Sequence, residues 1–174
     1  MGAFREDLEA AIPALRRYAR ALTRDDEIGD ELVQDSLVRA LQHEHLFNGG
    51  EVRGWLYTIL TNLNRDRLRS LARRQVRTMP EDSAALRIDR PDTALQDIER
   101  ALACLAEDRR AVVLLVALEG LSYREVAEVQ GVPVGTVMSR LARARTQIKA
   151  FLESKGQPSS ESMLGEADAV HPAE

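Results

Sequence analysis

Residues 121–149 form the stretch that decides the fold, and they read LSYREVAEVQGVPVGTVMSRLARARTQIK. Ser122 followed by Glu125 is the S-x-x-E pattern of a capping box, which predicts that a short helix begins here. Gly131 can take the positive φ of a tight turn. Pro133 suits the start of the next helix. Proline lacks an amide hydrogen, and in the first turn of a helix an amide hydrogen has no partner within the helix. The pattern predicts a helix-turn-helix, whose second helix enters the major groove of DNA.

The second helix of this pair has one apolar and one polar side. Its apolar residues recur at helical spacing: Val134, Val137, Leu141 and Ile148. The polar side carries Thr136, Ser139, Arg140 and Arg143. A helical hairpin with arginines on its solvated face is the simpler alternative and needs no DNA, so the rest of the chain has to decide between the two interpretations.

The composition indicates a soluble, all-α protein. The 174 residues are 44% hydrophobic and 30% charged, which fits one globular domain or two small ones. Aromatic residues make up only 4%, so the core must be aliphatic, and no segment has the alternation of a strand. Cys104 is the only cysteine, which excludes an internal disulfide, and the three histidines are scattered, which argues against a zinc site. We find no secretory signal or membrane span and expect a cytoplasmic protein without metal, cofactor or membrane insertion.

Charge is distributed unevenly along the chain. The net charge is −4, yet residues 53–77 hold seven arginines against the single Asp66. Residues 133–152 hold three arginines and Lys149 with no carboxylate, whereas residues 25–35 hold six carboxylates and no base. Because local charge decides what a surface binds, two basic segments keep nucleic acid open as a partner.

The hydrophobic pattern predicts two groups of helices with a linker between them. We expect helices over residues 4–22, 23–42, 52–74, 93–105 and 107–119, ahead of the helix-turn-helix. Pro13 predicts a kink in the first helix or a start at that residue. Residues 75–92 lose the periodicity and contain two prolines, so they form a linker. The predicted organisation is a domain over 1–74, a linker over 75–92, a second domain over 93–152, and a disordered acidic tail over 153–174.

Two of the expected helices have informative polar faces. The helix over 23–42 turns outward Asp30, Glu31, Gln34, Asp35 and Arg39, a solvated surface that fits a basic partner better than a metal. In the helix over 52–74 we assign Leu68 and Trp55 to the buried stripe and Tyr57, Asn62, Asn64, Arg65 and Arg69 to the polar side. Amides that read base edges and arginines that hold a backbone suit a single strand. Phe47, in the loop before this helix, is predicted to fill the hydrophobic core.

Three separate motifs occur in the order and at the distances of a known family. They are LTRDDEIGDELVQDSLVRAL from residue 22, VRGWLYTILTNLNRDRLR from residue 52, and LSYREVAEVQGVPVGTVMSRLARAR from residue 121. Over residues 8–150 the chain resembles an extracytoplasmic-function (ECF) sigma factor of bacterial RNA polymerase. The segment IPALRRYARAL is also similar to the alphaproteobacterial general-stress group.

The resemblance implies a two-domain initiation subunit and not an enzyme. Region two would dock on the β′ clamp helices of core RNA polymerase through Asp30, Glu31, Gln34, Asp35 and Arg39. It would recognise and melt the −10 element through Phe47, Asn48, Asn62, Arg65 and Arg69. Region four would contact the β flap and read the −35 element through Tyr123, Arg124, Thr136, Met138, Ser139, Arg140 and Arg143. Met138 departs from the basic residue common at its position, which puts the −35 sequence in doubt. An anti-sigma factor would control the protein in a stress response.

Two other functions remain open at this stage. A helix-turn-helix repressor or activator would bind duplex operators without polymerase and leaves the Asn/Arg helix unexplained. A sigma-like decoy would sequester an anti-sigma protein without reading DNA, and it predicts a weakened basic recognition helix. We find no nucleophile–base set, phosphate loop or metal cluster from which an enzyme could be built.

Overall fold

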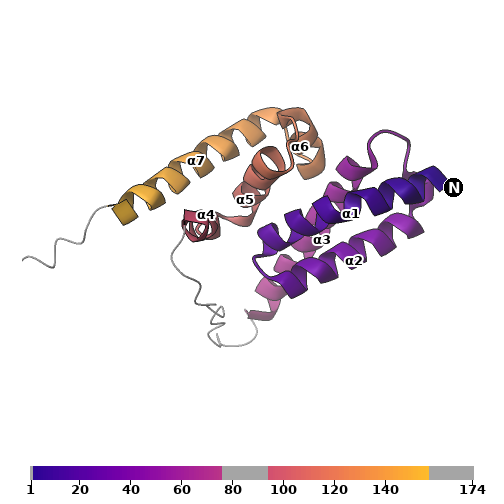
Figure 1. Cartoon of the computed structure of the whole chain (residues 1–174), viewed down its shortest axis with the longest axis horizontal. Helices are drawn as coiled ribbons and strands as arrows, with labels where there is room; N and C mark the ends of the chain where they lie inside the picture. The colour runs from indigo at the N-terminus through magenta and orange to yellow at the C-terminus, as the bar shows by residue number, and fades with distance from the viewer. Residues whose placement is uncertain (1, 76–93, 157–174) are drawn as a thin grey trace, which may run out of the picture.

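The computed structural model describes residues 2–75 and 94–156, and this part of the chain contains helices and no strand (Figure 1). The first three helices are α1 (Gly2–Thr23), α2 (Asp26–Gln42) and α3 (Val52–Gln75), with a 3-10 turn, η1 (Glu44–Leu46), between α2 and α3. The others are α4 (Ala94–Ala103), α5 (Glu107–Val113), a π-helical turn η2 (Leu114–Leu118), α6 (Tyr123–Gln130) and α7 (Val134–Gly156). The prediction of an all-α protein is confirmed.

Helices α1, α2 and α3 pack against one another and form the first helical group (Figure 1). The side chain of Asp25 accepts a 2.9 Å hydrogen bond from the Ile28 amide and caps α2, as the acidic start of this helix predicts. We predicted a kink or a helix start at Pro13. The start is wrong, because α1 begins at Gly2 and runs through this residue, and the kink stays a prediction. Gly29 is the point of closest approach between α1 and α2, since a Cβ there would lie 2.9 Å from the backbone of Arg20.

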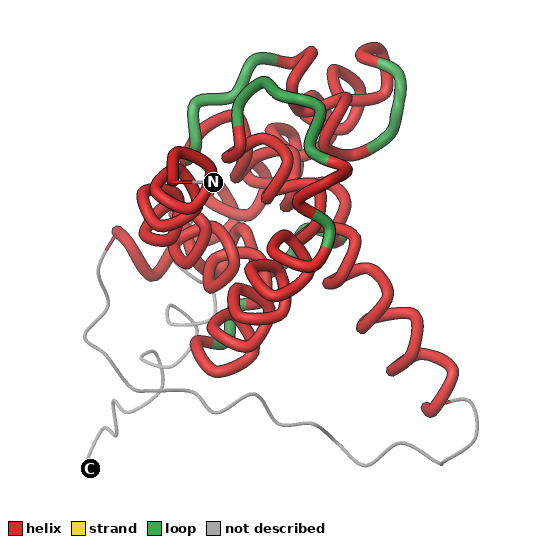
Figure 2. Tube along the Cα trace, turned by 90° about the vertical axis from the view of Figure 1, so that its right-hand side faces the viewer, coloured by secondary structure: helices red, strands yellow, loops and turns green. Residues whose placement is uncertain are grey.

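Helices α4 to α7 form the second helical group, in which α7 contacts α4, α5 and α6 (Figure 1). Figure 2 shows that short loops connect the helices within each described stretch. Ala111, Val112, Leu115, Val126 and Val137 are fully buried at the centre of this group. Gly120 and Gly131, at φ of 72° and 63°, follow η2 and α6 in the left-handed conformation expected of helix-terminating glycines. We predicted that a disordered tail begins at residue 153. The helix α7 continues to Gly156, so residues 153–156 are helical instead. Lys149 and Glu153, an i,i+4 pair 3.7 Å apart, support this extension.

The two helical groups share one hydrophobic core. Helix α3 packs against α6, and α1 packs against α5 and η2, so that buried residues of both groups belong to a single cluster. The predicted linker falls almost entirely, and the predicted tail mostly, outside the described residues. The division into two domains therefore stays a prediction.

Three side chains of α3 lie differently from what the sequence predicts. Tyr57 and Asn64 are at most 1% exposed, although we assigned them to the polar face, whereas Leu68 is 36% exposed. The physical reason is that α3 packs on two sides, against α1 and α2 and also against α6. Its inner surface is wider than one hydrophobic stripe. The Tyr57 hydroxyl donates to Glu119 and the side-chain amide of Asn64 donates to Glu107, both in the second group, whereas the buried side-chain oxygen of Asn64 has no partner in the described protein.

Replacement of Gly29 by alanine should destabilise the fold by about 1–3 kcal/mol, because the added methyl group would force α1 and α2 apart. Chemical denaturation of the full chain measures this. The matched control is Gly54→Ala in α3, where a Cβ meets nothing within 4 Å and stability should hold or rise slightly. Equal stabilities for the two variants would contradict the close approach of α1 and α2.

Candidate nucleic-acid interface

The helix-turn-helix is built by local interactions that the sequence predicts. The Ser122 amide donates to the Glu125 carboxylate at 2.7 Å, and the Glu125 amide donates to the Ser122 hydroxyl at 3.3 Å, which completes the capping box. The hydrogen bonds from Ser122 hold the pKa of the Glu125 carboxyl below its usual range. In the turn, the Val132 amide donates to the carbonyl of Ala127 at 3.0 Å. These contacts fix the direction in which α7 leaves the turn.

Most of the predicted −35 residues lie at the surface of α6 and α7. Tyr123, Arg124, Met138, Ser139 and Arg143 are exposed, and Thr136 is half-buried. Met138 is 54% exposed, a large apolar side chain without core contacts in the middle of this polar surface. These residues of α6 and α7 are therefore accessible to solvent, and their grouping into one DNA-binding face stays a prediction.

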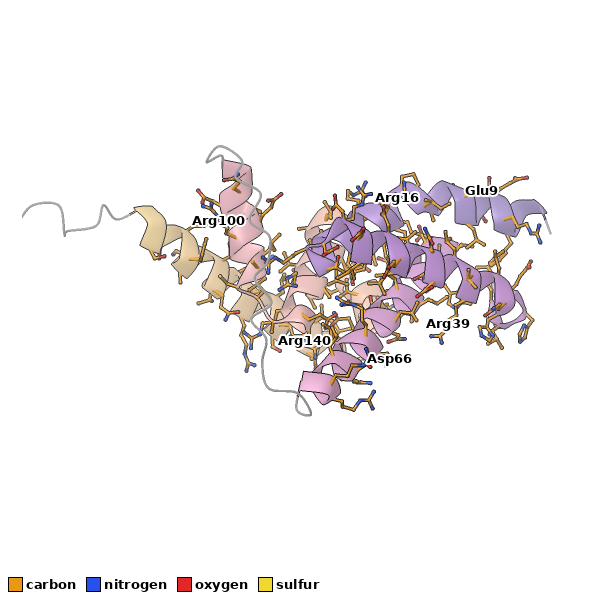
Figure 3. The ribbon with its side chains drawn as sticks, turned by 90° about the horizontal axis from the view of Figure 1, so that it is seen from below. Glu9, Arg16, Arg39, Asp66, Arg100 and Arg140 are labelled. Atoms are coloured by element: carbon orange, nitrogen blue, oxygen red, sulfur yellow. The ribbon has the colours of Figure 1, made fainter. Side chains whose placement is uncertain are left out.

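Arg140 differs from the other two arginines of this set, because its guanidinium has side-chain partners inside the protein. Its guanidinium forms a 3.0 Å ion pair with Asp108 and donates a 2.6 Å hydrogen bond to the side-chain oxygen of Gln130. Only 23% of the side chain is exposed, and Arg140 lies near the boundary between the helical groups (Figure 3). Arg143, one turn further on, is the freer cation for a DNA contact.

The loop before α3 combines an aromatic cluster with a cavity. The ring of Phe47 packs against those of Phe4 and Trp55, both at centroid distances of 5.4 Å, so the prediction that it fills the core is confirmed. Asn48, next to it, is exposed. A cavity of about 620 Å³ lies between this loop, α3 and the second helical group, whose Glu119, Glu125 and Glu128 form its opposite wall.

The polar residues of α3 are not equivalent. Asn62 and Arg69 are exposed, and Arg69 lies 3.6 Å from Asp66 in a surface ion pair. Arg65 is half-buried and donates a 3.1 Å hydrogen bond to the backbone carbonyl of Gln130 in the second helical group. The predicted −10 residues of α3 are therefore divided between two exposed residues, Asn62 and Arg69, and one residue, Arg65, that contacts the other group.

The predicted polymerase-binding face of α2 is mostly solvated. Glu31, Gln34, Asp35 and Arg39 are exposed, and Figure 3 shows Arg39 projecting from the α1–α3 side of the molecule. Asp30 instead faces α1, where Arg20 donates to it at 2.7 and 3.0 Å and Arg16 lies at 3.3 Å. Its hydrogen bonds with Arg20 lower the pKa of the Asp30 carboxyl. The carboxylate of Asp30 therefore serves mainly to join α2 to α1.

Among the described residues, no group of three histidine, cysteine or carboxylate side chains could hold a metal ion. Nor does any described helix combine the length and apolarity that crossing a bilayer requires.

Sequence reasoning missed the polar network between the helical groups. Glu119 is buried and bonded to Arg17, Arg53 and Tyr57. Gln130 is also buried, and it is the residue that both Arg65 and Arg140 contact. Nothing in the local pattern marks these residues, because their partners are distant in sequence. A lone acid at the end of an apolar helix is the only sign that could have drawn attention to Glu119.

Comparisons with known proteins match both helical groups. The sigma-70 region 4 family matches residues 95–148, and the sigma2 domain of PhyR matches residues 8–61. The ECF RNA polymerase sigma factor EcfG of Rhodopseudomonas palustris (strain TIE-1) is 37% identical over 157 residues, covering 87% of this chain and 86% of the relative. The ECF RNA polymerase sigma factor SigM of Mycobacterium tuberculosis is 36% identical over 141 residues, covering 79% and 71%. Among solved structures, the sigma factor RpoE of Bartonella quintana, in complex with the anti-sigma factor NepR, matches with a TM-score of 0.73 at 30% identity, covering 88% of this chain and 98% of that one.

Removal of the capping box should loosen the helix-turn-helix. Ser122→Ala should cost about 1 kcal/mol of stability at neutral pH, because the first turn of α6 loses an acceptor. The folded-state pKa of Glu125 is lowered, so its stabilising effect is present above the usual glutamate range and is lost as pH falls through the lowered pKa. Thermal denaturation should therefore show a smaller acid-induced loss in Ser122→Ala than in the parent. Thr146→Ala, on the exposed side of α7, serves as the control, and identical acid profiles for parent and Ser122→Ala would contradict the capping role.

Proposed function

Because this chain belongs to the extracytoplasmic-function sigma factors, we propose that it binds core RNA polymerase and directs transcription initiation at a specific set of promoters. The observation that carries the proposal is that both helical groups match sigma-factor families, over residues 8–61 and 95–148, and that EcfG aligns with 87% of the chain. Sigma factors are transcription regulators, a class that is not generally enzymatic, and they act by binding. We place the protein's action in the cytoplasm, where polymerase and promoter DNA are found.

The second helical group would read the −35 element. The face of α6 and α7 that carries Tyr123, Arg124, Thr136, Met138, Ser139, Arg140 and Arg143 would enter the major groove. Arg143 is exposed and ready for a guanine edge or a phosphate. Met138 would present an apolar surface that suits a thymine methyl group better than a hydrogen-bonding edge.

The first helical group would melt the −10 element and hold the opened strand. Melting requires no covalent chemistry: capture of an extruded base offsets an unstacking cost of a few kcal/mol. The cavity beside Phe47 and Asn48 could receive that base. Asn62 and Arg69, both exposed, and Arg65 would hold the strand that follows.

Helix α2 would supply the main contact with polymerase. Its exposed residues Glu31, Gln34, Asp35 and Arg39 suit the basic and polar surface of the β′ clamp helices. Asp30, already paired with Arg16 and Arg20, would contribute by keeping α1 and α2 in register and less by direct contact. The second helical group would touch the β flap.

A negative regulator is part of the proposal. The Bartonella quintana relative was crystallised with the anti-sigma factor NepR, and the match covers both of our helical groups. We propose that an anti-sigma factor of that kind holds this chain inactive until a stress signal releases it.

A decoy that sequesters an anti-sigma factor is the second candidate. It is favoured by one observation, the match of residues 8–61 to the sigma2 domain of PhyR. Arg143, exposed on α7 among the predicted −35 residues, favours DNA binding instead.

Purified protein added to core RNA polymerase should start run-off transcription at a subset of a promoter library, whereas polymerase alone should not. This result would distinguish a sigma factor from a decoy, because a decoy would bind an anti-sigma factor and yield no transcripts. Absence of both core binding and transcripts would refute the proposal.

Two substitutions should separate duplex reading from melting. Arg143→Ala should weaken binding to a −35 duplex roughly 5- to 150-fold, the effect of about 1–3 kcal/mol for one base contact. Asn62→Ala should leave that affinity unchanged and reduce permanganate reactivity of the opened −10 thymines. Arg145→Ala, an exposed arginine on another side of α7, is the matched control. Equal loss in all three variants would mean that general charge, not these positions, governs recognition.

A further inference from the structure

Glu119 is a buried carboxylate held between the two helical groups. Its side chain is fully buried and accepts hydrogen bonds from Arg17 at 3.0 and 2.8 Å and from Arg53 at 3.1 Å. The Tyr57 hydroxyl donates a further short hydrogen bond to it. Arg53 also donates to the backbone carbonyl of Glu119 at 2.6 Å. All of these donors belong to the first helical group, so the charge of Glu119 is compensated only while the groups are packed together.

The backbone that presents Glu119 is unusual. It follows the five-residue π-helical turn η2, in which the Glu119 amide donates to the carbonyl of Leu114 at 3.1 Å. Such wide turns are rare and are frequently found at functional sites. Here the turn shifts the end of the α5–η2 helix by one residue relative to a continuous α-helix, and that shift sets the direction in which Glu119 projects.

The same packing engages a residue that the proposed function needs for DNA. Arg65 of α3, which is proposed to hold the −10 strand, donates a 3.1 Å hydrogen bond to the backbone oxygen of the buried Gln130 in the second group. The side-chain oxygen of Gln130 accepts from Arg140 at 2.6 Å within that group. Of these two bonds, only the one from Arg65 would be lost on separation of the groups.

The packing also encloses the proposed base cavity. Glu119, Glu125 and Glu128 of the second group line it together with the Phe47 loop. Glu125 and Glu128 are exposed, and their negative charge disfavours a phosphodiester backbone there. The packed arrangement therefore hinders access of a DNA strand to the cavity, whereas most of the −35 residues of α6 and α7 stay exposed.

We infer that Glu119 is a latch that holds the two helical groups together in a closed conformation that masks the proposed −10 surface, and that the groups separate at this residue before the −10 strand is bound. The expected effect on promoter binding rests on the proposed function, whereas the role of Glu119 in holding the two helical groups together does not. The latch is reversible, because on opening the carboxylate and both guanidinium groups return to water, which replaces their hydrogen bonds. Binding of polymerase to the separate groups can therefore open it by favouring the open state.

Pulsed electron-spin distance measurement on the full chain tests the latch without DNA or polymerase. One spin label goes on the native, exposed Cys104 and the other on Glu9→Cys, an exposed position at the start of α1 (Figure 3). The parent should give one narrow distance distribution. Glu119→Gln keeps the shape of the side chain but removes its charge, and it should raise the open, broadly distributed fraction about tenfold or more relative to the closed one.

Two further variants keep the result interpretable. Arg17→Gln breaks the same network from α1, and because half of that side chain is already exposed, the first group should stay folded. Glu99→Gln removes an exposed carboxylate on α4 and should leave the distance distribution of the parent unchanged. Distributions for Glu119→Gln and Arg17→Gln that coincide with that of the parent would overturn the latch.

Run-off transcription at limiting protein concentration tests the consequence. Unlabelled Arg17→Gln should yield severalfold more transcript than the parent, while Glu99→Gln should match the parent. If Arg17→Gln opens the chain without raising transcription, opening is not the limiting step and the regulatory inference is wrong. If the parent itself yields no transcript with any promoter, the proposed function fails, and the spin-label result still decides whether Glu119 holds the two groups together.

Discussion

A carboxylate cannot remain charged in a protein interior unless other groups replace the water it has lost. Glu119 meets this requirement with two guanidinium groups and a phenol, and all three come from the other helical group. Burial and the hydrogen bond to Glu119 raise the pKa of Tyr57 far above its usual value, so this phenol stays a donor. The relative position of the two groups follows from this one requirement, together with the aliphatic packing of α3 against α6 and of α1 against η2.

Arginine dominates the basic residues of this protein, and its side chain suits both the internal contacts described above and contacts with DNA. A guanidinium offers five donors in a planar fork and can exchange protein acceptors for phosphate or base acceptors without changing its charge. Arg65 and Arg140 use Gln130 and Asp108 in the packed arrangement. Arg110, half-buried where α5 meets α1, donates to four backbone carbonyls, including that of Leu22, and burial lowers its pKa. Some arginines thus stabilise the fold permanently, while others have partners that DNA could replace.

Acidic residues are divided in a similar way. Asp25 caps α2, Asp30 joins α2 to α1, and Glu125 caps α6, so each serves a local structural purpose. Glu31 and Asp35 have no such function in the fold and remain exposed on α2. This contrast makes them better candidates for a docking surface than Asp30, which sequence spacing alone placed in the same set.

Local signals in the sequence determined the helices of this protein, their caps and the family. The Ser122–Glu125 capping box, Asp25 and the turn glycines act within a few residues, so their effect can be predicted without a fold. What the sequence could not determine was the partner of each polar side chain on α3 and η2. In the sequence Tyr57 and Asn64 resemble surface residues, and they are buried because the second helical group packs over them. Glu119 resembles an exposed acid at a helix end, and its three hydrogen-bond donors lie 62 to 102 positions away along the chain. Only the tertiary structure decided these contacts, because burial of a polar group depends on the element that packs against it and not on its neighbours along the chain.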